Sequence, residues 1–237
     1  MSFKIDIVIP VYNEEPLLEK NIKILNEFLH ANLRHKYTII IANNGSTDKT
    51  LKKAKELSRK YDEITYFHMD QKGRGGVIKR IWLESKADIV SYMDVDLSAN
   101  LESFLKLVDS LIINKYDLAV GSRLMPGSKV KRKFFRSTLT CVYNMLLKLI
   151  FSVKKFSDAQ CGIKVLTKNT ADELLPYVKN QNWFFDSELL LLAEKKDFRI
   201  KNIPLEWVER PESKVNILST IGEDITGILR FYFSYIK

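Results

Sequence analysis

The stretch IDIVIPVYNEEPLLEKNIKILNEFL, residues 5–29, decides the fold class of this chain. It opens on β-branched residues, which are typical of a buried strand, and a polar loop around Asn13 follows. After this loop an apolar residue recurs at helical spacing, at Leu18, Ile22, Leu25 and Leu29. A strand followed directly by a helix predicts a parallel sheet covered by helices.

The same alternation continues through the first half of the chain. Further strand-like runs occupy residues 37–42, 64–69, 89–93 and 118–120, and a second helical row is formed by Leu101, Leu105, Val108 and Ile112. We interpret both helical rows as core. Ligands of open parallel sheets bind beyond the carboxyl ends of the strands, where polar loops gather in this chain. The sequence therefore predicts an α/β fold with its site in these loops.

Composition excludes several classes of protein. The chain has 237 residues and is 46% hydrophobic, which is enough for a packed core and excludes a largely disordered chain. Cys141 and Cys161 fit neither a metal motif nor a disulfide framework. The apolar part of MSFKIDIVIP is too short for a signal peptide, and no run approaches the roughly 18 apolar residues of a membrane span. We expect a cytosolic chain.

The positive charge is concentrated in one segment. The formal net charge is +9, and residues 121–168 alone contain eleven basic residues and one acidic residue, a net +10. Such a segment fits nucleic acid, an anionic membrane surface or a phosphorylated substrate. A solvated face without a partner fits it equally well.

Two carboxylates at the end of a predicted strand indicate a metal site. Asp94 and Asp96 are two residues apart, so their side chains can lie on the same side of the chain. Together they can hold one hard divalent cation, Mg²⁺ or Mn²⁺, through oxygen ligands. A cation held there can neutralise a diphosphate leaving group.

Three strand ends together resemble one enzyme family. The segments VIPVYNE (8–14), ANNGSTD (42–48) and SYMDVDL (91–97) are similar to motifs of the family 2 inverting glycosyltransferases, which have the GT-A nucleotide-sugar-binding fold. The resemblance implies a mostly parallel sheet flanked by helices. It also implies that the nucleotide-sugar contacts Pro10, Tyr12, Asn13, Glu14, Asn44, Asp48 and Asp94. Asn43 and Asn44 replace the usual acidic pair, and Asn44 can still hydrogen-bond a base or ribose.

Later motifs resemble the dolichyl-phosphate and polyprenyl-phosphate sugar synthases. QKGRGG (71–76) is similar to their glycine loop, in which Gly73 and Gly75 permit close approach to a ligand and Arg74 can meet phosphate. The resemblance also places Lys72 among the residues that contact the nucleotide-sugar. GSR (121–123), DAQCGIK (158–164), WFFDSEL (183–189) and WVERPESKV (207–215) follow in the same order. The last three are most similar to the dolichyl-phosphate β-glucosyltransferase branch. Together with the three strand ends, these motifs cover nearly the whole chain in register.

The resemblance implies transfer of a hexose from a nucleotide-sugar to a polyprenyl or dolichyl monophosphate with inversion, and it favours glucose from UDP-glucose. It makes Asp96 the more direct metal ligand and places Arg210 and Lys214 over the diphosphate. An acceptor phosphate is largely ionised near neutral pH, because its second pKa is about 6, so it needs no general base. Asp158 and Asp186 are the candidates for a base, although orienting an arginine or capping a helix is the favoured role.

The resemblance assigns the acceptor phosphate to the basic segment. Arg132 and Arg136 are four residues apart and would share one face of a helix, where they could clamp the phosphate together with Arg123. Thr140, Asn144 and Lys148 continue this polar stripe, and apolar residues fill the rest of the surface. Such a helix fits a membrane interface or, equally, a core helix with one wet edge.

We therefore predict a GT-A glycosyltransferase domain at residues 1–215 and, in the same unit, an amphipathic helix at residues 216–237. The apolar row of this helix is Ile217, Ile221, Ile225, Ile228, Leu229 and Tyr232. We expect peripheral attachment to the cytoplasmic face of a membrane. A mannosyltransferase using GDP-mannose, an enzyme with a polysaccharide acceptor, and a nucleic-acid-binding protein using the basic segment are the alternatives. Because no nucleic-acid motif is recognised, we expect no nucleic-acid partner.

Overall fold

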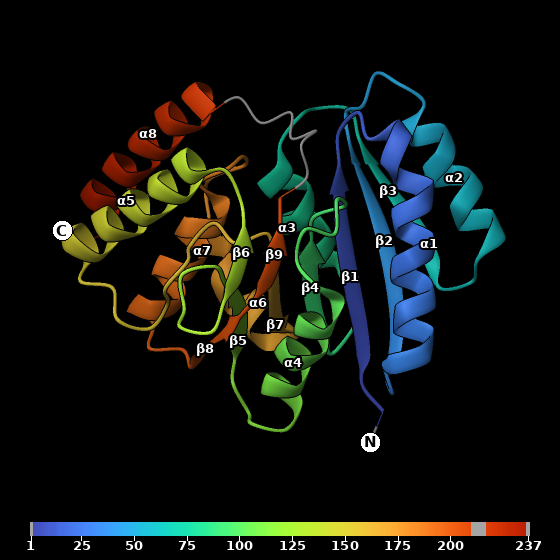
Figure 1. Cartoon of the computed structure of the whole chain (residues 1–237), viewed down its shortest axis with the longest axis horizontal. Helices are drawn as coiled ribbons and strands as arrows, with labels where there is room; N and C mark the ends of the chain where they lie inside the picture. The colour runs from blue at the N-terminus through green and yellow to red at the C-terminus, as the bar shows by residue number, and fades with distance from the viewer. Residues whose placement is uncertain (1, 210–216, 236–237) are drawn as a thin grey trace.

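A computed structural model describes residues 2–209 and 217–235 of the chain (Figure 1). Its centre is a seven-stranded sheet with the order β3-β2-β1-β4-β7-β5-β8. These strands are β1 (Lys4–Val11), β2 (Lys36–Asn44), β3 (Ile64–Met69), β4 (Ile89–Met93), β5 (Leu118–Ser122), β7 (Ile163–Thr167) and β8 (Ile200–Pro204). β7 is antiparallel to β4 and β5, and the other described pairs in this sheet are parallel. The predicted mostly parallel α/β sheet is confirmed.

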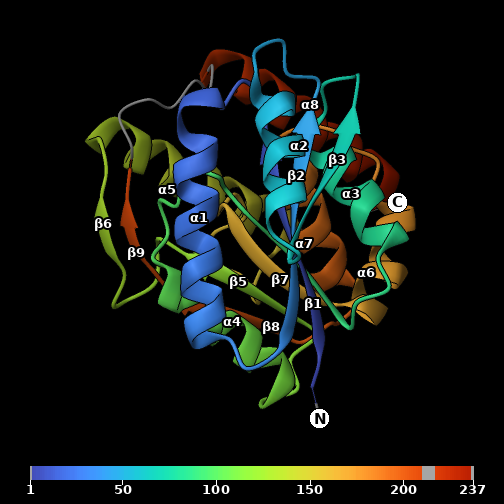
Figure 2. The ribbon, with the colours of Figure 1, turned by 90° about the vertical axis from the view of Figure 1, so that its right-hand side faces the viewer.

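Helices cover both faces of this sheet. They are α1 (Glu15–Asn32), α2 (Thr50–Lys60), α3 (Arg74–Glu84), α4 (Leu101–Ile112), α6 (Lys168–Leu174), the short 3₁₀ helix η1 (Leu175–Tyr177) and α7 (Phe185–Lys195). In Figure 2, α1 and α4 lie on one side of the sheet and α3, α6 and α7 on the other. The loops that follow β1, β2 and β4 lie at the carboxyl edge of the parallel strands, and those after β1 and β2 are at the top of Figure 1.

One of the two predicted core rows is correct and the other is displaced. On α1 all four predicted residues, Leu18, Ile22, Leu25 and Leu29, are buried. On α4 the buried apolar residues are Phe104, Leu107, Val108 and Leu111, so only Val108 belongs to the predicted row. The apolar stripe of α4 is wide enough to contain two rows: the Phe104 row is buried, and Leu101 and Ile112 of the predicted row are partly buried and pack against the same core.

The remaining elements form one end of the molecule. β6 (Lys129–Lys131) and β9 (Glu206–Val208) make a separate two-stranded parallel ribbon. The helices α5 (Phe134–Phe151) and α8 (Ile217–Tyr235) lie side by side on the left of Figure 1. Phe151 and Phe231 join them, with ring centroids 5.4 Å apart. The predicted C-terminal helix therefore exists and packs against α5.

Candidate active site

Polar side chains tie the loops after β1 and β2 together. Asn13 has a left-handed backbone, with a φ of 55°, and its Oδ1 accepts the Thr47 N–H at 2.8 Å. The Asp48 carboxylate accepts the Thr50 N–H at 2.9 Å, and Thr50 Oγ1 accepts the Glu14 N–H at 2.9 Å. Three residues predicted to bind nucleotide, Asn13, Glu14 and Asp48, thus lie within one hydrogen-bonded pair of loops.

The glycine loop approaches these loops from the other side. Lys72 Nζ lies 4.0 Å from the centroid of the Tyr12 ring, which is cation–π distance. Asn44 is buried at the end of β2, and its Oδ1 accepts the Gly73 N–H at 2.7 Å. Pro10 lies one residue before the end of β1. The structure therefore brings the three predicted nucleotide segments to one edge of the sheet.

The glycines of this loop contact protein. A Cβ on Gly75 would lie 2.4 Å from Phe185 Cβ, and one on Gly73 would lie 3.1 Å from the Gln181 carbonyl oxygen. These glycines therefore allow a close approach to the segment around the start of α7, and their approach to a ligand stays a prediction. The physical reason is that α3 begins at Arg74 and packs its first turn against that segment.

Arg74 joins two motifs that are 92 residues apart in the sequence. Its Nη2 donates to Asp94 Oδ1 at 2.8 Å and its Nη1 donates to Asp186 Oδ2 at 2.7 Å. The guanidinium carbon lies 4.8 Å from the Tyr92 ring centroid and 5.3 Å from the Trp183 ring centroid. Arg74 therefore orients the Asp94 carboxylate through ion pairs, and its contact with a ligand phosphate stays a prediction.

Asp186 is the centre of a buried ion cluster. Lys164 Nζ lies 2.9 Å from Asp186 Oδ1, the Tyr92 hydroxyl donates to the same oxygen, and the Lys164 side chain is 0% exposed. Burial alone would raise the pKa of Asp186, but the positive charges of Lys164 and Arg74 outweigh it and hold the pKa below its ordinary value. Asp186 is therefore an ionised partner of two cations. The sequence motif contained Lys164, but a lone lysine within a strand carried no signal for this role.

Asp94 and Asp96 line one hollow together with Gly162 and Trp207. Asp96 accepts the Ser98 N–H at 2.9 Å and the Ser98 hydroxyl at 2.6 Å. A Cβ on residue 162 would lie 1.8 Å from Asp94 Oδ2, so glycine is required beside this carboxylate.

The donor set of this hollow suits a metal that is shared with a ligand. Within the described ranges, 2–209 and 217–235, no group of three or more His, Cys, Asp or Glu side chains forms a metal site by itself. Asp94 and Asp96 offer oxygen donors, which Mg²⁺ and Mn²⁺ prefer, and Mg²⁺ commonly binds one or two carboxylates together with substrate phosphates. The residues present therefore fit a divalent cation that a bound diphosphate completes.

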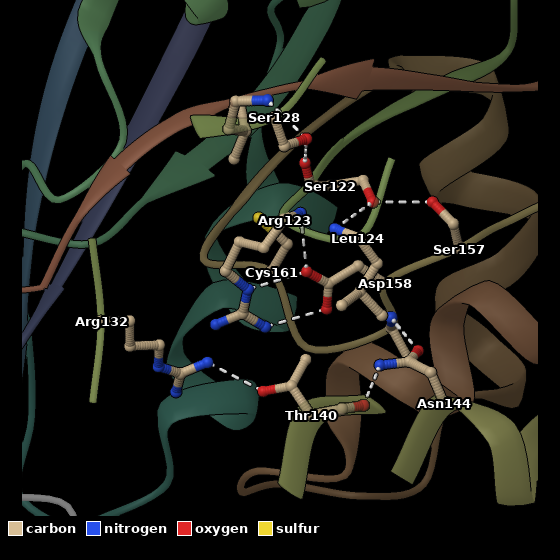
Figure 3. Close-up of polar contacts among 12 residues, drawn as sticks. Ser122, Arg123, Leu124, Ser128, Arg132, Thr140, Asn144, Ser157, Asp158 and Cys161 are labelled. Atoms are coloured by element: carbon tan, nitrogen blue, oxygen red, sulfur yellow. Dashed lines mark hydrogen bonds and ion pairs between the residues drawn. The ribbon is translucent and has the colours of Figure 1, made fainter. Parts of the chain in front are cut away.

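Arg123 forms a two-pronged ion pair beside this hollow (Figure 3). Its Nε donates to Asp158 Oδ2 at 2.7 Å and its Nη2 donates to Asp158 Oδ1 at 2.8 Å. Burial would raise the pKa of Asp158, and the Arg123 charge outweighs it and keeps the pKa below its ordinary value. Arg123 also lies over Trp207, with its guanidinium carbon 5.1 Å from the ring centroid. The structure thus places Asp158 as the partner that orients Arg123.

Arg132 and Arg136 converge, but not through helical spacing. Residues 129–131 form β6 and α5 begins at Phe134, so Arg132 lies outside the helix on which we placed it. Glu209 Oε1 nevertheless accepts Arg132 Nε–H at 3.1 Å and Arg136 Nη1–H at 2.9 Å. Glu209 had no assigned role, because the pairing of β6 with β9 that brings it here is not visible in local sequence. Arg210 and Lys214 lie outside the described residues.

Thr140 and Asn144 of the polar stripe of α5 face inward, whereas Lys148 is exposed, and most apolar residues of this helix face outward, with Leu147 the fully buried exception. Asn144 is buried, and Thr140 accepts a hydrogen bond from Arg132 at 2.8 Å. The exposed apolar residues of α5 are Phe134, Phe135, Val142, Met145, Leu146, Leu149 and Ile150, and those of α8 are Ile221, Ile225, Leu229, Tyr232 and Phe233. The alternative of a core helix with one wet edge is therefore wrong. No helix in the described part of the chain is long and apolar enough to cross a membrane.

Comparisons of the sequence with known proteins identify one family. The family model described as Glycosyl transferase family 2 matches residues 6–169. Glycosyltransferase AglD of Haloferax volcanii is 30% identical over 97% of this chain, and the chain spans 37% of that protein's length. A dolichyl-phosphate beta-glucosyltransferase of Dictyostelium discoideum is 31% identical over 98% of this chain, which spans 75% of that protein.

Solved structures share the fold. Glucosyl-3-phosphoglycerate synthase of Mycobacterium tuberculosis, in complex with UDP, matches 98% of this chain with a TM-score of 0.73 and 16% identity, over 80% of that chain. The mannosyltransferase PcManGT of Pyrobaculum calidifontis, in complex with GDP-Man and Mn²⁺, also matches 98% of this chain, with a TM-score of 0.63 and 14% identity over 65% of its own length. At these identities the likeness concerns the fold, which agrees with the predicted GT-A architecture.

Proposed function

Because this chain belongs to glycosyl transferase family 2, we propose that it transfers glucose from UDP-glucose to the phosphate of a polyprenyl monophosphate such as dolichyl phosphate. The Dictyostelium relative, a dolichyl-phosphate beta-glucosyltransferase, supports both the sugar and the lipid acceptor. The observation that carries the proposal is the position of Trp207, which lines the hollow with Asp94 and Asp96 and also carries Arg123 on its ring. The acidic site that we propose for the donor, at Asp94 and Asp96, therefore lies next to the cationic site that we propose for the acceptor, at Arg123.

The donor half of the proposed site consists of the hollow and the loops at the strand ends. Asp96 and Asp94 would hold Mg²⁺ or Mn²⁺, which supplies positive charge against the diphosphate when it is bound. Arg74 keeps the Asp94 carboxylate in place through its 2.8 Å contact. Tyr12 and Asn13 belong to the loop after β1, which is tied to the loop after β2. We place the nucleoside at these two loops.

The acceptor half consists of the arginines. Arg123, Arg132 and Arg136 would bind the acceptor phosphate by charge-assisted hydrogen bonds. An ionised phosphate oxygen attacks C1 of glucose, a C1–O bond forms, and the bond from C1 to the diphosphate breaks so that UDP leaves. Attack from the side opposite the leaving group inverts C1. Because the attacking oxygen already carries the negative charge, no residue has to remove a proton.

The outward apolar residues of α5 and α8 support contact with the membrane that contains such an acceptor. Phe134 is 86% exposed and Leu149 is 73% exposed, and the exposed lysines 131, 133, 148 and 154 lie along the same segment. Apolar side chains flanked by cations are typical of helices that lie in a bilayer interface. We propose peripheral attachment through this pair of helices, on the cytoplasmic face.

The test is a transfer assay with several donors. The chain is incubated with Mn²⁺, dolichyl or undecaprenyl phosphate and labelled UDP-glucose, UDP-galactose or GDP-mannose, and label is followed into an organic extract. We expect a glucolipid from UDP-glucose. Label from GDP-mannose alone would assign the sugar to mannose, and no labelled lipid with any donor would refute the lipid-phosphate acceptor.

A further inference from the structure

Glu209 places a carboxylate on the arginines that we assign to the acceptor phosphate. Its Oε1 accepts from Arg132 Nε and Arg136 Nη1, and its Oε2 accepts the Lys133 N–H at 3.2 Å. The side chains of Arg132, Arg136 and Glu209 are only 15%, 21% and 14% exposed. A largely buried carboxylate that two arginines share has the charge and hydrogen-bonding pattern of a bound oxyanion.

The β6–β9 ribbon fixes this carboxylate in place. Lys131 pairs with Val208 in the parallel register, and the Glu209 N–H donates to the Lys131 carbonyl oxygen at 2.9 Å. The next residue on each side is therefore Arg132 opposite Glu209. Burial alone would raise the pKa of Glu209, but the Lys133 N–H and the two arginines outweigh it and lower the pKa. The carboxylate is thus ionised at neutral pH.

We propose that Glu209 is an internal competitor for the acceptor-phosphate site, which an acceptor must displace from Arg132 and Arg136 before it can bind. This inference rests on the proposed function, because it takes the two arginines as acceptor ligands. Its consequence is selectivity by threshold. The phosphodiester headgroups of a membrane carry one charge and bind arginines more weakly than a phosphomonoester dianion, so a much higher concentration of them is needed to displace the carboxylate.

Displacement has a thermodynamic signature. If every anion has to remove Glu209 first, the same free energy is subtracted from the binding of each, and deleting the carboxylate strengthens all of them by one common factor. If Glu209 stays bound and acts only through its charge, the gain would instead be larger for a dianion than for a monoanion. If Glu209 merely holds the arginines in position, its loss would weaken binding.

The experiment compares Glu209→Gln with wild type. Binding of geranyl phosphate, and of its methyl ester as a phosphodiester, is measured by calorimetry without a sugar donor. We expect both ligands to bind roughly tenfold more tightly to Glu209→Gln, which corresponds to about 1.4 kcal/mol. Glu206→Gln is the matched control, because it removes the same charge from the same ribbon, where an exposed Glu206 pairs with Lys129. Weaker binding, unchanged binding, or unequal gains for the two ligands would each overturn the proposal.

A measurement on the wild-type chain keeps the proposal testable if Glu209→Gln does not fold. The ¹⁵N resonance of Arg132 Nε, absent in Arg132→Lys, reports the bond to Glu209. We expect it to shift on titration with geranyl phosphate, and an unmoved resonance at saturation would refute displacement. These measurements need no turnover. Failure of the transfer assay alone would therefore refute the proposed function, whereas weaker binding to Glu209→Gln alone would refute this inference.

Discussion

Asp186 illustrates how single buried charges hold this site together. It is 5% exposed and is paired at the same time with Lys164, which is 0% exposed, and with Arg74. Arg74, Lys164 and Asp186 thus lie in a region from which water is largely absent, and Asp94, whose side chain is 37% exposed, borders it. In such a region a charge that loses its partner is costly, because neither solvent nor another side chain replaces it.

We predict that Asp186→Asn lowers the free energy of unfolding by about 3–5 kcal/mol, since it leaves Lys164 without its carboxylate in the protein interior. Urea unfolding at neutral pH measures the change. Asp197→Asn is the control: it also removes an aspartate from a lysine, Lys155, but Asp197 is 93% exposed. Its free energy of unfolding should stay near that of wild type. Equal effects of the two substitutions would contradict the buried-cluster interpretation.

The second prediction at this scale concerns Asp96. Its carboxylate faces the hollow and is oriented by Ser98. Asp96→Asn removes one of the two charges that would hold the cation, so we expect kcat/KM to fall by roughly 100-fold or more. Electron paramagnetic resonance should show weaker Mn²⁺ binding in the presence of UDP. Asp109→Asn, an exposed carboxylate on α4, should change neither quantity. Retained Mn²⁺ binding and turnover in Asp96→Asn would exclude the metal role.

At the scale of elements, α8 is joined to α5 through a buried polar cluster. Asp224 on α8 accepts Gln160 Nε2–H at 2.9 and 2.8 Å, and it is 3.5 Å from the Tyr143 hydroxyl of α5. The Tyr143 hydroxyl oxygen in turn lies 2.6 Å from Oγ of Ser187 on α7, which is hydrogen-bond distance. The helix pair on the outside is therefore connected to the DAQCG segment and to the helix that carries Asp186.

This cluster predicts a pH-dependent stability. Burial, with the nearby charges of Glu223 and Asp186, raises the pKa of Asp224 from its ordinary 3.8 to about 6, against the hydrogen bonds from Gln160 and Tyr143. Between pH 4 and 6 the native state therefore holds a proton that the unfolded chain has released. The free energy of unfolding contributed by this group falls as pH rises through that window, by up to about 3 kcal/mol.

We expect Asp224→Asn to remove this loss. Urea unfolding at pH 4 and pH 7 measures the free energy of unfolding of both proteins. The value for Asp224→Asn minus the value for wild type should be larger at pH 7 than at pH 4 by up to about 3 kcal/mol. Asp172→Asn removes a half-exposed carboxylate of α6 and should reproduce the wild-type profile. A difference between Asp224→Asn and wild type that does not change with pH would rule out titration of Asp224.

At the scale of the whole molecule, the strand and helix order was predictable and the long-range pairings were not. The bounds of β1 and β2 agree with prediction within two residues, because β-branched runs stop at polar loops. Glu209 escaped prediction because its partners lie more than 70 residues away in the sequence. Likewise, the inward side of α5 could not be known until its neighbours were placed.

At the same scale, the basic residues of the segment 121–168 divide into two groups. The net +10 of residues 121–168 suggested one cationic surface. In the structure Arg123 and Lys164 are buried in ion pairs, and Arg132 and Arg136 share Glu209. The charges that face solvent are mainly the lysines around the exposed apolar residues of α5. The net charge counted along the sequence therefore combined two groups: the ion-paired cations of the proposed site and the exposed lysines around α5.

This division predicts how the chain should bind vesicles. We expect it to float with phosphatidylcholine vesicles that contain phosphatidylserine, and to float less as salt rises, because the screening length falls from about 10 Å at 0.1 M to about 3 Å at 1 M. Leu149→Glu places a charge on the apolar face and should weaken flotation several-fold. Ile113→Glu changes a residue that is 68% exposed at the end of α4, away from α5 and α8, and should float like wild type. Flotation of Leu149→Glu at the wild-type level would exclude this face as the membrane contact, and salt-independent binding to neutral vesicles would exclude the contribution of the lysines.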